Sequence, residues 1–305
     1  MKFKKTLTIA IPTYNRAPFL KQNLENITSQ IKGLEDQIEV MISDNCSEDN
    51  TQEVVKEFID RGVPLVYNRN SKNLGMDGNF VYCFKNASSK YVWLLGDDDY
   101  LVEGTLARLL EIMNSGEYGL IHLFPFLDSY PDNFEVYSNK TSFVGDIGFY
   151  ITFISANIVR TKYVEKIDFT KYLGTYFTLI PVYLTAAINE KDNVMVRFKT
   201  LEAGQDAITN GGFNIFEISV TNYLNVIKEF RCKLGWKWYE IEKYRLCRKY
   251  LVGLMQSFLI DKKLGPRFET KGWLSITLKK YWYEPYIYPV FALLLYRKVK
   301  SRFKK

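Results

Sequence analysis

Three consecutive aspartates, Asp97, Asp98 and Asp99, follow the apolar run YVWLL and one glycine. Carboxylates a few ångströms apart repel one another unless a positive charge lies between them. A divalent cation can supply that charge, and oxygen ligands favour Mg²⁺ or Mn²⁺, which also bind substrate phosphates. The alternative is a solvated acidic turn that caps a helix near Glu103, because aspartates favour helix starts. After an apolar strand we favour the metal site.

Polar residues also follow three earlier apolar runs. Asp44 offers a carboxylate that can accept a hydrogen bond from a nucleobase N–H, although a turn or N-cap aspartate fits the same position. Arg69 can bind a phosphate through its charge or stack on a nucleobase. The alternative is an ordinary surface arginine. The three polar segments contain Pro12, Thr13, Tyr14, Asn15 and Arg16; then Asp44, Asn45, Ser47 and Asp49; then Arg69, Asn70, Asn73 and Gly75.

The elements that must position these residues alternate along the first third of the chain. Apolar runs at 6–11, 38–42, 65–67 and 91–95 read as strands, and helical spacing of apolar residues separates them. This alternation predicts an α/β fold with parallel strands and right-handed crossovers. Ligands of such sheets bind beyond the carboxyl ends of the strands, so we expect the polar segments to meet in one crevice.

The rest of the chain shows a different pattern. Residues 121–124, 151–158 and 194–198 are β-rich runs, with a helix near 176–188, and after about residue 216 the pattern is helical, including a long segment at 236–260. We expect boundaries near residues 115 and 215, which divide the chain into 1–115, 116–215 and 216–305, the last a helical, aromatic and basic region that associates with a membrane.

The composition excludes several kinds of site. The single histidine, His122, lies in an apolar run and reads as a core residue, which removes Ser-His-Asp triads and His-rich zinc sites. The four cysteines have no CxxC spacing, and neither GxGxxG nor GxxxxGK[ST] occurs, so dinucleotide and P-loop phosphate binding are unsupported. With no apolar leader after Met1, we expect reduced thiols and a cytoplasmic location.

The end of the chain is apolar and then basic. No acidic residue follows Glu284, and the apolar stretch 286–296, interrupted by Pro289, is shorter than the roughly 20 residues that span a bilayer. It fits an interfacial segment with cationic anchors, against the alternative of a packed helix with a solvated tail. We expect peripheral contact with an anionic membrane surface at the cytoplasmic face of the inner membrane, and no nucleic-acid binding. The basic residues are Arg297, Lys298, Lys300, Arg302, Lys304 and Lys305.

Four segments carry a family resemblance. TIAIPTYNRAPFL, VMISDNCSEDNT, NRNSKNLGMDGNF and WLLGDDDYLVEGTL resemble the family 2 glycosyltransferases of the glycosyltransferase-A fold, in the expected order and spacing over residues 6–107. The motifs ISDN, RNS-NLG and GDDD most resemble those of the branch that builds bacterial surface polysaccharides, including abequosyltransferase-like enzymes. The resemblance implies a Rossmann-like, mostly parallel sheet flanked by helices, Mg²⁺ or Mn²⁺ as cofactor, and a nucleotide-diphosphate sugar donor. It also implies that 1–115 is the nucleotide-sugar-binding half and 116–215 the acceptor-binding half of the same catalytic domain.

The resemblance also implies roles for single residues. Gly96 stands where many members have the first aspartate of a DxDD motif, so Asp98 and its neighbour Asp99 fall at the metal position, with the direct ligand left open. Inverting members use a later carboxylate base, often written ED. The candidate is Asp206, which follows Gln205 and fits a helix N-cap or turn as the alternative. The donor-nucleotide residues are Pro12, Tyr14, Asn15, Arg16, Asp44, Arg69, Asn73 and Asp97.

The predicted function is therefore inverting, metal-dependent transfer of a sugar to a hydroxyl of a glycan or lipid-linked acceptor, in lipopolysaccharide O-antigen or capsule biosynthesis. The alternative of another class is a catalytically silent scaffold that binds nucleotide sugars or glycans in an assembly complex. A sugar-1-phosphate nucleotidyltransferase would need a Gly-rich basic loop after the first strand, and residues 12–16 are not that loop. The sequence leaves the sugar, base, linkage and oligomeric state open.

Overall fold

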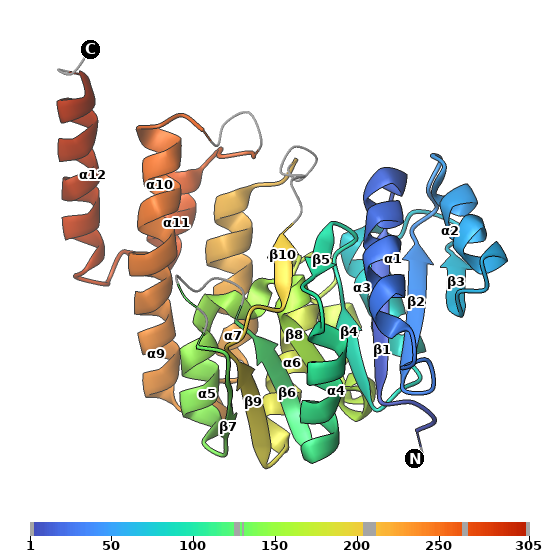
Figure 1. Cartoon of the computed structure of the whole chain (residues 1–305). Coiled ribbons are helices and arrows are strands. Elements are labelled where there is room, and N and C mark those ends of the chain that lie inside the picture. Colours follow the sequence, from blue (N-terminus) through green and yellow to red (C-terminus); the bar gives the residue numbers. More distant parts are fainter. Residues whose placement is uncertain (1–2, 125–128, 130, 204–211, 264–267, 303–305) are drawn as a thin grey trace. The chain divides into compact units, whose positions relative to one another are not determined.

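The computed structural model of the 305-residue chain describes residues 3–124, 129, 131–203, 212–263 and 268–302 (Figure 1). The chain forms two compact units, Met1–Gln205 and Asp206–Lys305. The first contains all the strands named below, and the second is helical.

An eight-stranded sheet forms the centre of the first unit, in the order β3-β2-β1-β4-β8-β6-β9-β7. Its first four strands pair in parallel, as the sequence predicted: β3 (Leu65–Arg69), β2 (Ile38–Asp44), β1 (Leu7–Thr13) and β4 (Tyr91–Leu94). The other half is mixed, because β8 (Asn157–Arg160) runs antiparallel to β4 and β6 (Tyr118–Leu123), β9 (Asp192–Val196) is parallel to β6, and β7 (Phe134–Tyr137) is the antiparallel edge.

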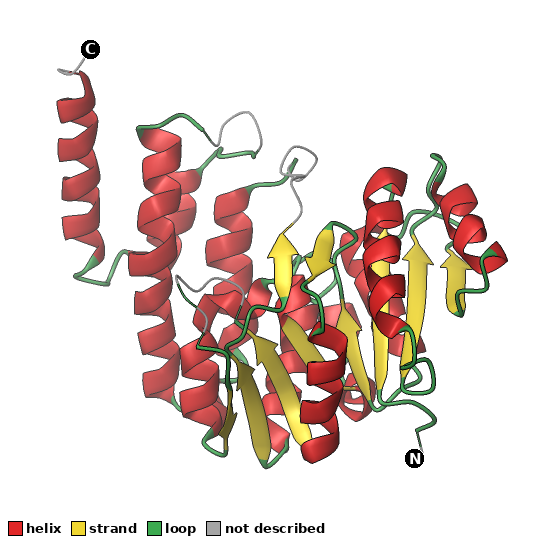
Figure 2. Ribbon diagram, in the orientation of Figure 1, coloured by secondary structure: helices red, strands yellow, loops and turns green. Residues whose placement is uncertain are grey.

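Helices cover both faces of this sheet (Figure 2). On one face, the apolar stripe of α1 (Ala17–Ile31) and the apolar residues of α4 (Thr105–Ser115) form one buried core with alternate residues of β1. On the other face lie α3 (Gly75–Asn86) and α6 (Leu179–Asn189) (Figure 1). The first unit also contains α2 (Thr51–Asp60), α5 (Lys140–Ile147), and 3-10 turns η3 (Thr161–Lys166) and η4 (Phe169–Lys171).

One predicted strand is wrong. The run 151–158 forms two 3-10 turns, η1 (Gly148–Thr152) and η2 (Ile154–Ala156), before β8 begins at Asn157. The Asn157 side chain donates to the carbonyls of Ile151 and Phe153, at 3.2 and 3.0 Å, which holds the segment in tight turns. Apolar runs are buried both in strands and in such turns, so the hydrophobic pattern of 151–158 did not distinguish the two.

A second, two-stranded sheet follows the aspartate cluster. It pairs β5 (Asp99–Leu101) antiparallel with β10 (Leu201–Ala203), which puts Ala203 opposite Asp99. The sequence did not predict these short strands, because three residues are too few for a hydrophobic period to be read.

The second unit confirms the predicted helical carboxyl-terminal region. Among its described helices none is long and apolar enough to cross a lipid bilayer. The helices are α7 (Tyr223–Lys228), α8 (Arg231–Leu234), α9 (Trp236–Arg245), α10 (Val252–Leu259), α11 (Trp273–Tyr281) and α12 (Ile287–Arg302), with π-helical stretches η5 (Glu217–Asn222) and η6 (Leu246–Leu251).

Candidate active site

The loops that follow β1 and β2 are bonded to each other at the carboxyl edge of the sheet. The Asn15 amide donates to Ser47 Oγ at 2.9 Å, and Asn15 Oδ1 accepts from the Glu48 amide at 2.7 Å. The amide of Ala17, the first residue of α1, donates to Asp49 Oδ2 at 2.9 Å. Asn15 has a φ of 54°, a left-handed conformation that asparagine tolerates well. These bonds fix the backbone on both sides of Arg16.

Arg16 lies between two of the three aspartates. Its Nε is 2.7 Å from Asp97 Oδ1, and its Nη2 is 2.6 Å from Asp98 Oδ2. Thr13 Oγ1 donates to the other oxygen of Asp97 at 2.7 Å. The guanidinium carbon also lies 4.7 Å from the ring centroid of Phe19. In this structure, therefore, Arg16 supplies positive charge to the carboxylate cluster, a role for which the sequence suggested a divalent cation.

The three aspartates differ in burial. Asp97 and Asp99 are buried, and loss of solvent raises the pKa of each carboxyl to about 6. The Ser155 hydroxyl donates to Asp99 Oδ2 at 2.5 Å and accepts from the Gly96 amide at 2.8 Å. The Asp98 side chain keeps 21% of its surface exposed, against 7% for Asp97. Asp98 is thus the more accessible of these two carboxylates.

Gly96 is required by this packing. A Cβ at position 96 would lie 2.9 Å from Asp99 Oδ2 and 3.3 Å from Asp98 Oδ1, closer than side chains normally approach. A larger side chain therefore has no room here unless the neighbouring carboxylates move. Gly96 and the inward position of Asp99 are structurally linked.

Asp44 stabilises the turn that follows β2. Its side chain is fully buried; Oδ1 accepts from the Ser47 amide at 2.8 Å, and Oδ2 accepts from the Tyr67 hydroxyl at 2.8 Å. The turn role considered from the sequence is therefore present. Arg69 lies beside it, with Nη2 donating to the Ser47 carbonyl at 2.9 Å and Nε 3.7 Å from Asp44 Oδ2. The Arg69 side chain remains 34% exposed, so the accessible charge here belongs to the arginine.

Asparagine side chains join the ends of β2 and β3 to the start of α3. Asn45 Nδ2 donates to Asn73 Oδ1 at 2.8 Å, and Asn45 Oδ1 accepts from the Leu74 amide at 2.9 Å. Asn70 Nδ2 donates to Asn79 Oδ1 at 3.1 Å. Asn73, a predicted donor residue, thus belongs to a hydrogen-bonded network at this edge, and its side chain is exposed.

The structure also contributes residues that the sequence analysis did not identify. Asp77, on the first turn of α3, is 8% exposed and accepts from the amides of Gly174 and Tyr176 at 2.8 and 3.0 Å, and from the Thr178 hydroxyl at 3.2 Å. It fixes a loop in which Tyr176 has a φ of 67°. The motif GMDGNF displays this aspartate, but no sequence pattern indicates a partner about a hundred residues away.

Four further residues were singled out in the sequence. Pro12 is partly buried in β1, opposite Ser43 of β2, and Tyr14 is 41% exposed just beyond the strand. Asp206 lies outside the described residues. His122 is buried in β6 with Nδ1 2.9 Å from Asn157 Oδ1, and burial lowers its pKa to about 4.

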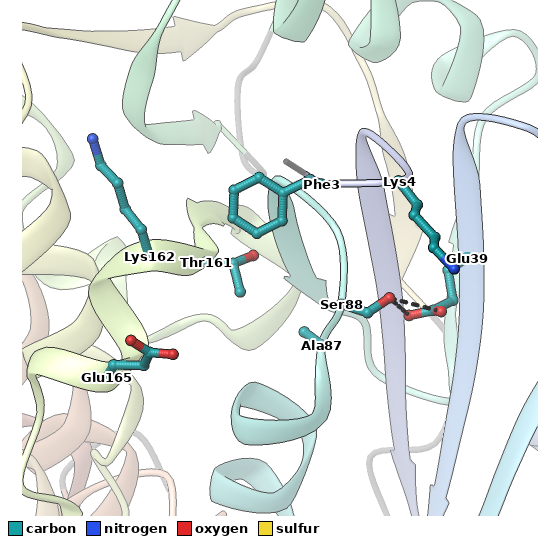
Figure 3. A pocket seen from close by; sticks show the side chains of 8 residues that line it. All are labelled: Phe3, Lys4, Glu39, Ala87, Ser88, Thr161, Lys162 and Glu165. Atoms are coloured by element: carbon teal, nitrogen blue, oxygen red, sulfur yellow. Dashed lines mark hydrogen bonds between the residues drawn. The ribbon is translucent and has the colours of Figure 1, made fainter. Parts of the chain in front are cut away.

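A cavity lies at the opposite edge of the sheet. It has a volume of about 620 Å³ and lies near the amino ends of β1 and β4, away from the aspartates (Figure 3). Glu39 accepts hydrogen bonds from Ser88 there. Because the predicted chemistry belongs to the carboxyl edge, this cavity is not the candidate site. Its lining residues are Phe3, Lys4, Glu39, Ala87, Ser88, Thr161, Lys162 and Glu165.

The sequence model of the family described as Glycosyl transferase family 2 matches residues 8–176, more than half of the chain. The chain is a family 2 glycosyltransferase. The matched range contains every predicted site residue from Pro12 to Asp99, and the predicted family and enzyme class are confirmed.

Curated relatives of this glycosyltransferase match about a third of its length. Abequosyltransferase RfbV of Salmonella typhimurium is 40% identical over 110 residues, 36% of this chain and 33% of that protein. The GalNAc(5)-diNAcBac-PP-undecaprenol beta-1,3-glucosyltransferase of Campylobacter jejuni is 34% identical over 113 residues, 36% of this chain and 35% of that protein. The match thus spans about a third of the length of these relatives.

Solved structures confirm the predicted fold of the glycosyltransferase. S. aureus TarS 1-349 in complex with UDP-GlcNAc superposes with a TM-score of 0.65 at 14% identity, covering 89% of this chain and 79% of that one. The mannosyltransferase PcManGT from Pyrobaculum calidifontis, in complex with GDP-Man and Mn2+, gives a TM-score of 0.55 at 14% identity and covers 100% of this chain and 89% of that one. At these identities the likeness shows a shared fold.

The side chains of the site fit a divalent ion that is shared with a substrate. Among the residues that the structure describes, no three His, Cys, Asp or Glu side chains gather closely enough to hold a metal ion by themselves. Mg²⁺ usually keeps waters and binds through one or two carboxylates together with substrate phosphates, so such a group is not required. Asp98 offers a partly exposed carboxylate for this role, while Asp99 faces Ser155.

Proposed function

We propose that this glycosyltransferase transfers a sugar from a nucleotide-diphosphate donor to a hydroxyl of a glycan or lipid-linked acceptor during bacterial surface-polysaccharide biosynthesis, with inversion at the anomeric carbon. The arrangement of Arg16, Asp97 and Asp98 at the carboxyl edge of β1 and β4 carries the proposal, because it places an arginine fork and an accessible carboxylate together. The printed names of the Salmonella and Campylobacter relatives, an abequosyltransferase and a glucosyltransferase of an undecaprenol-linked glycan, support the substrate class.

The donor nucleotide lies along the carboxyl ends of β1, β2 and β3 in this proposal. Tyr14 and Arg69 offer exposed groups to the nucleoside, and Asp44 holds the turn and the Tyr67 hydroxyl beside them. Asp97 faces the ribose. The diphosphate lies next to Arg16, because a guanidinium donates two parallel hydrogen bonds to phosphate oxygens. Pro12, Asn15 and Asn73 form the walls of this nucleotide site.

The residues of the metal position are Asp98 and its neighbour Asp99. Mg²⁺ or Mn²⁺, when bound, supplies a Lewis acid that offsets the negative charge on the departing nucleotide diphosphate. Asp98 contributes the accessible carboxylate, and Ser155 holds Asp99 in place through its hydroxyl. Arg16 adds a second positive charge on the side of the leaving group.

Asp206 is the proposed general base. Its carboxylate accepts the proton of the acceptor hydroxyl while that oxygen bonds to the anomeric carbon and the bond from this carbon to the donor phosphate breaks. A positioned base of this kind contributes about 10²–10⁴-fold. The resemblance to inverting members of the family, which use a later carboxylate as the base, supports the assignment. In this scheme residues 1–115 bind the donor and residues 116–215 the acceptor.

Donor hydrolysis tests the proposal directly. Purified protein is incubated with a panel of UDP-, GDP- and CDP-sugars, with MnCl₂ or with EDTA, and release of the nucleotide diphosphate is measured. We expect release from a subset of donors that EDTA abolishes and that Asp98→Asn lowers by at least about 10²-fold. Asp206→Asn is expected to slow transfer to an acceptor by about 10²-fold or more. The matched control is Asp168→Asn, at the exposed aspartate that caps the start of η4.

Two results contradict the proposal. Metal-independent release that Asp98→Asn leaves unchanged removes the metal role. Binding of nucleotide sugars without any turnover, with every donor and acceptor tried, indicates the silent scaffold instead.

The end of the chain is the proposed membrane contact. In α12, Leu295 and Tyr296 are 65% and 62% exposed, and Lys300 lies 5.8 Å from the Tyr296 ring. Exposed aromatic and basic residues on one helix are typical of an interface with anionic lipid. We propose that α12 holds the enzyme at the inner membrane face, where a lipid-linked acceptor resides.

Vesicle sedimentation tests this contact. We expect the protein to bind vesicles that contain phosphatidylglycerol but not vesicles of pure phosphatidylcholine. The double substitution L295Q with Y296Q should weaken this vesicle binding about tenfold or more, because it removes two apolar side chains from the interface. Trp236→Gln, at an equally exposed aromatic of α9, is the control. Unchanged sedimentation of the double variant would refute the role of α12.

A further inference from the structure

We propose that Arg16 acts as a built-in counter-ion, which holds Asp98 until the diphosphate of the donor takes over the guanidinium, so that divalent metal and diphosphate bind together. The inference rests on the proposed function, since it assumes that Asp98 contacts metal. It adds that the two ligands depend on each other. Metal alone competes with Arg16 for Asp98, whereas a bound diphosphate pairs with the guanidinium and so removes this competition.

The bonds that Arg16 makes to Asp97 and Asp98 are unequal in their surroundings. The Nε bond goes to Asp97, a buried carboxylate whose other oxygen accepts from Thr13. The Nη2 bond goes to Asp98, whose side chain is the more exposed. Solvent weakens an ion pair, so the bond to Asp98 is the easier one to exchange. Arg16 can therefore keep Asp97 and change its second partner.

The surroundings of Arg16 keep the guanidinium at this place. Its backbone is fixed by the Asn15 and Ala17 hydrogen bonds to the loop after β2, and its planar group stacks over Phe19. Only 15% of the side chain is exposed. An exchange of partners thus needs a small movement of the Nη2 edge, because the rest of the residue is held.

Charge makes the two ligands cooperative. A dication beside Asp98 meets the positive guanidinium at short range, which weakens its binding in the absence of an anion. A diphosphate placed between both cations turns that repulsion into two attractions. Coupling of this kind is reciprocal, so each ligand strengthens the binding of the other by the same factor.

Electron paramagnetic resonance of free Mn²⁺ tests this at pH 8 without any turnover. The probes are MnCl₂ alone and MnCl₂ with inorganic pyrophosphate, corrected for the Mn²⁺ that pyrophosphate binds in the absence of protein. For the unchanged protein we expect weak binding of Mn²⁺ alone and binding at least about 30-fold tighter with pyrophosphate.

The Arg16→Met variant gives the decisive comparison. We expect it to bind Mn²⁺ alone about tenfold more tightly than the unchanged protein and to gain only a few-fold from pyrophosphate. Arg16→Lys keeps the charge and should stay close to the unchanged protein. Adding Asp98→Asn to Arg16→Met should abolish the gain in Mn²⁺ affinity. Lys21→Met, which removes an exposed charge of α1 paired with Glu57, is the matched control.

The outcomes distinguish a failure of the counter-ion role of Arg16 from a failure of the metal role proposed for Asp98. If Arg16→Met binds Mn²⁺ no more tightly than the unchanged protein, or keeps the whole pyrophosphate gain, the counter-ion role is refuted while the metal role stands. If the unchanged protein binds no Mn²⁺ even with pyrophosphate, the metal role proposed for Asp98 fails as well. Circular dichroism and the melting temperature establish that each variant is folded, and Arg16→Gln replaces Arg16→Met if the latter is not.

Discussion

Replacing Asp77 with alanine tests how the loop beside α3 is held. The carboxylate accepts from two amides, those of Gly174 and Tyr176, and from the Thr178 hydroxyl, and it is 8% exposed. The substitution leaves these donors without their acceptor in a place that water reaches poorly. A hydrogen bond to a charged group is worth about 1.5–3 kcal/mol, and part of this returns when water enters the gap. Desolvation of the carboxylate, which raises its pKa, subtracts from the total.

We therefore expect Asp77→Ala to lower the free energy of unfolding by about 3 kcal/mol, measured by urea denaturation. Hydrogen exchange gives the local readout, because the amides of Gly174 and Tyr176 should lose protection far beyond the average of the first unit. Asp168→Ala is the matched control: Asp168 also accepts from a backbone amide, that of Thr170, but is exposed, so a loss of at most about 1 kcal/mol is expected. Equal losses in the two variants, or unchanged exchange at Gly174, would refute the reasoning.

Three further predictions concern the two units. Gly96→Ala brings a methyl group to 2.9 Å from Asp99 Oδ2, so we expect a loss of donor turnover of about tenfold or more with a folded protein by circular dichroism, and normal turnover would contradict the packing argument. Arg69→Ala should weaken nucleotide-diphosphate binding about tenfold in calorimetry while the melting temperature changes little, because its side chain is 34% exposed. Burial raises the pKa of Glu242 to about 7 from 4.5, and its Oε2 has no hydrogen-bond partner. The folded state therefore keeps this proton after the unfolded state has lost it, so the stability contribution is complete below pH 4.5 and is lost as the pH rises through about 7, by up to about 3 kcal/mol. Glu242→Gln should flatten this part of the stability curve, and an unchanged slope in chemical denaturation between pH 4.5 and 7.5 would oppose it.

Periodicity and strand-end chemistry predicted the half of the fold that contains the aspartate cluster. The runs at 6–11, 38–42 and 91–95 became the buried parallel strands β1, β2 and β4, because a strand buried on both faces must be a continuous apolar run. The run at 65–67 became β3, a partly exposed edge strand that is parallel to β2. Parallel strands bring their carboxyl ends to one edge, so the polar residues that follow them were predictable as neighbours. The same logic failed for 151–158, where side-chain bonds from Asn157 decided the backbone.

The sequence by itself therefore determined the sheet that carries the site, the family and the set of polar residues at its edge, because each of these follows from local pattern. Only the tertiary structure decided which side chains bond to one another. It placed Arg16 between Asp97 and Asp98, turned Asp99 toward Ser155, buried Asp44 under Tyr67, and joined Asp77 to a distant loop. These pairings link residues from about 20 to about 100 positions apart, and a carboxylate in a sequence carries no sign of which donor the fold will bring to it.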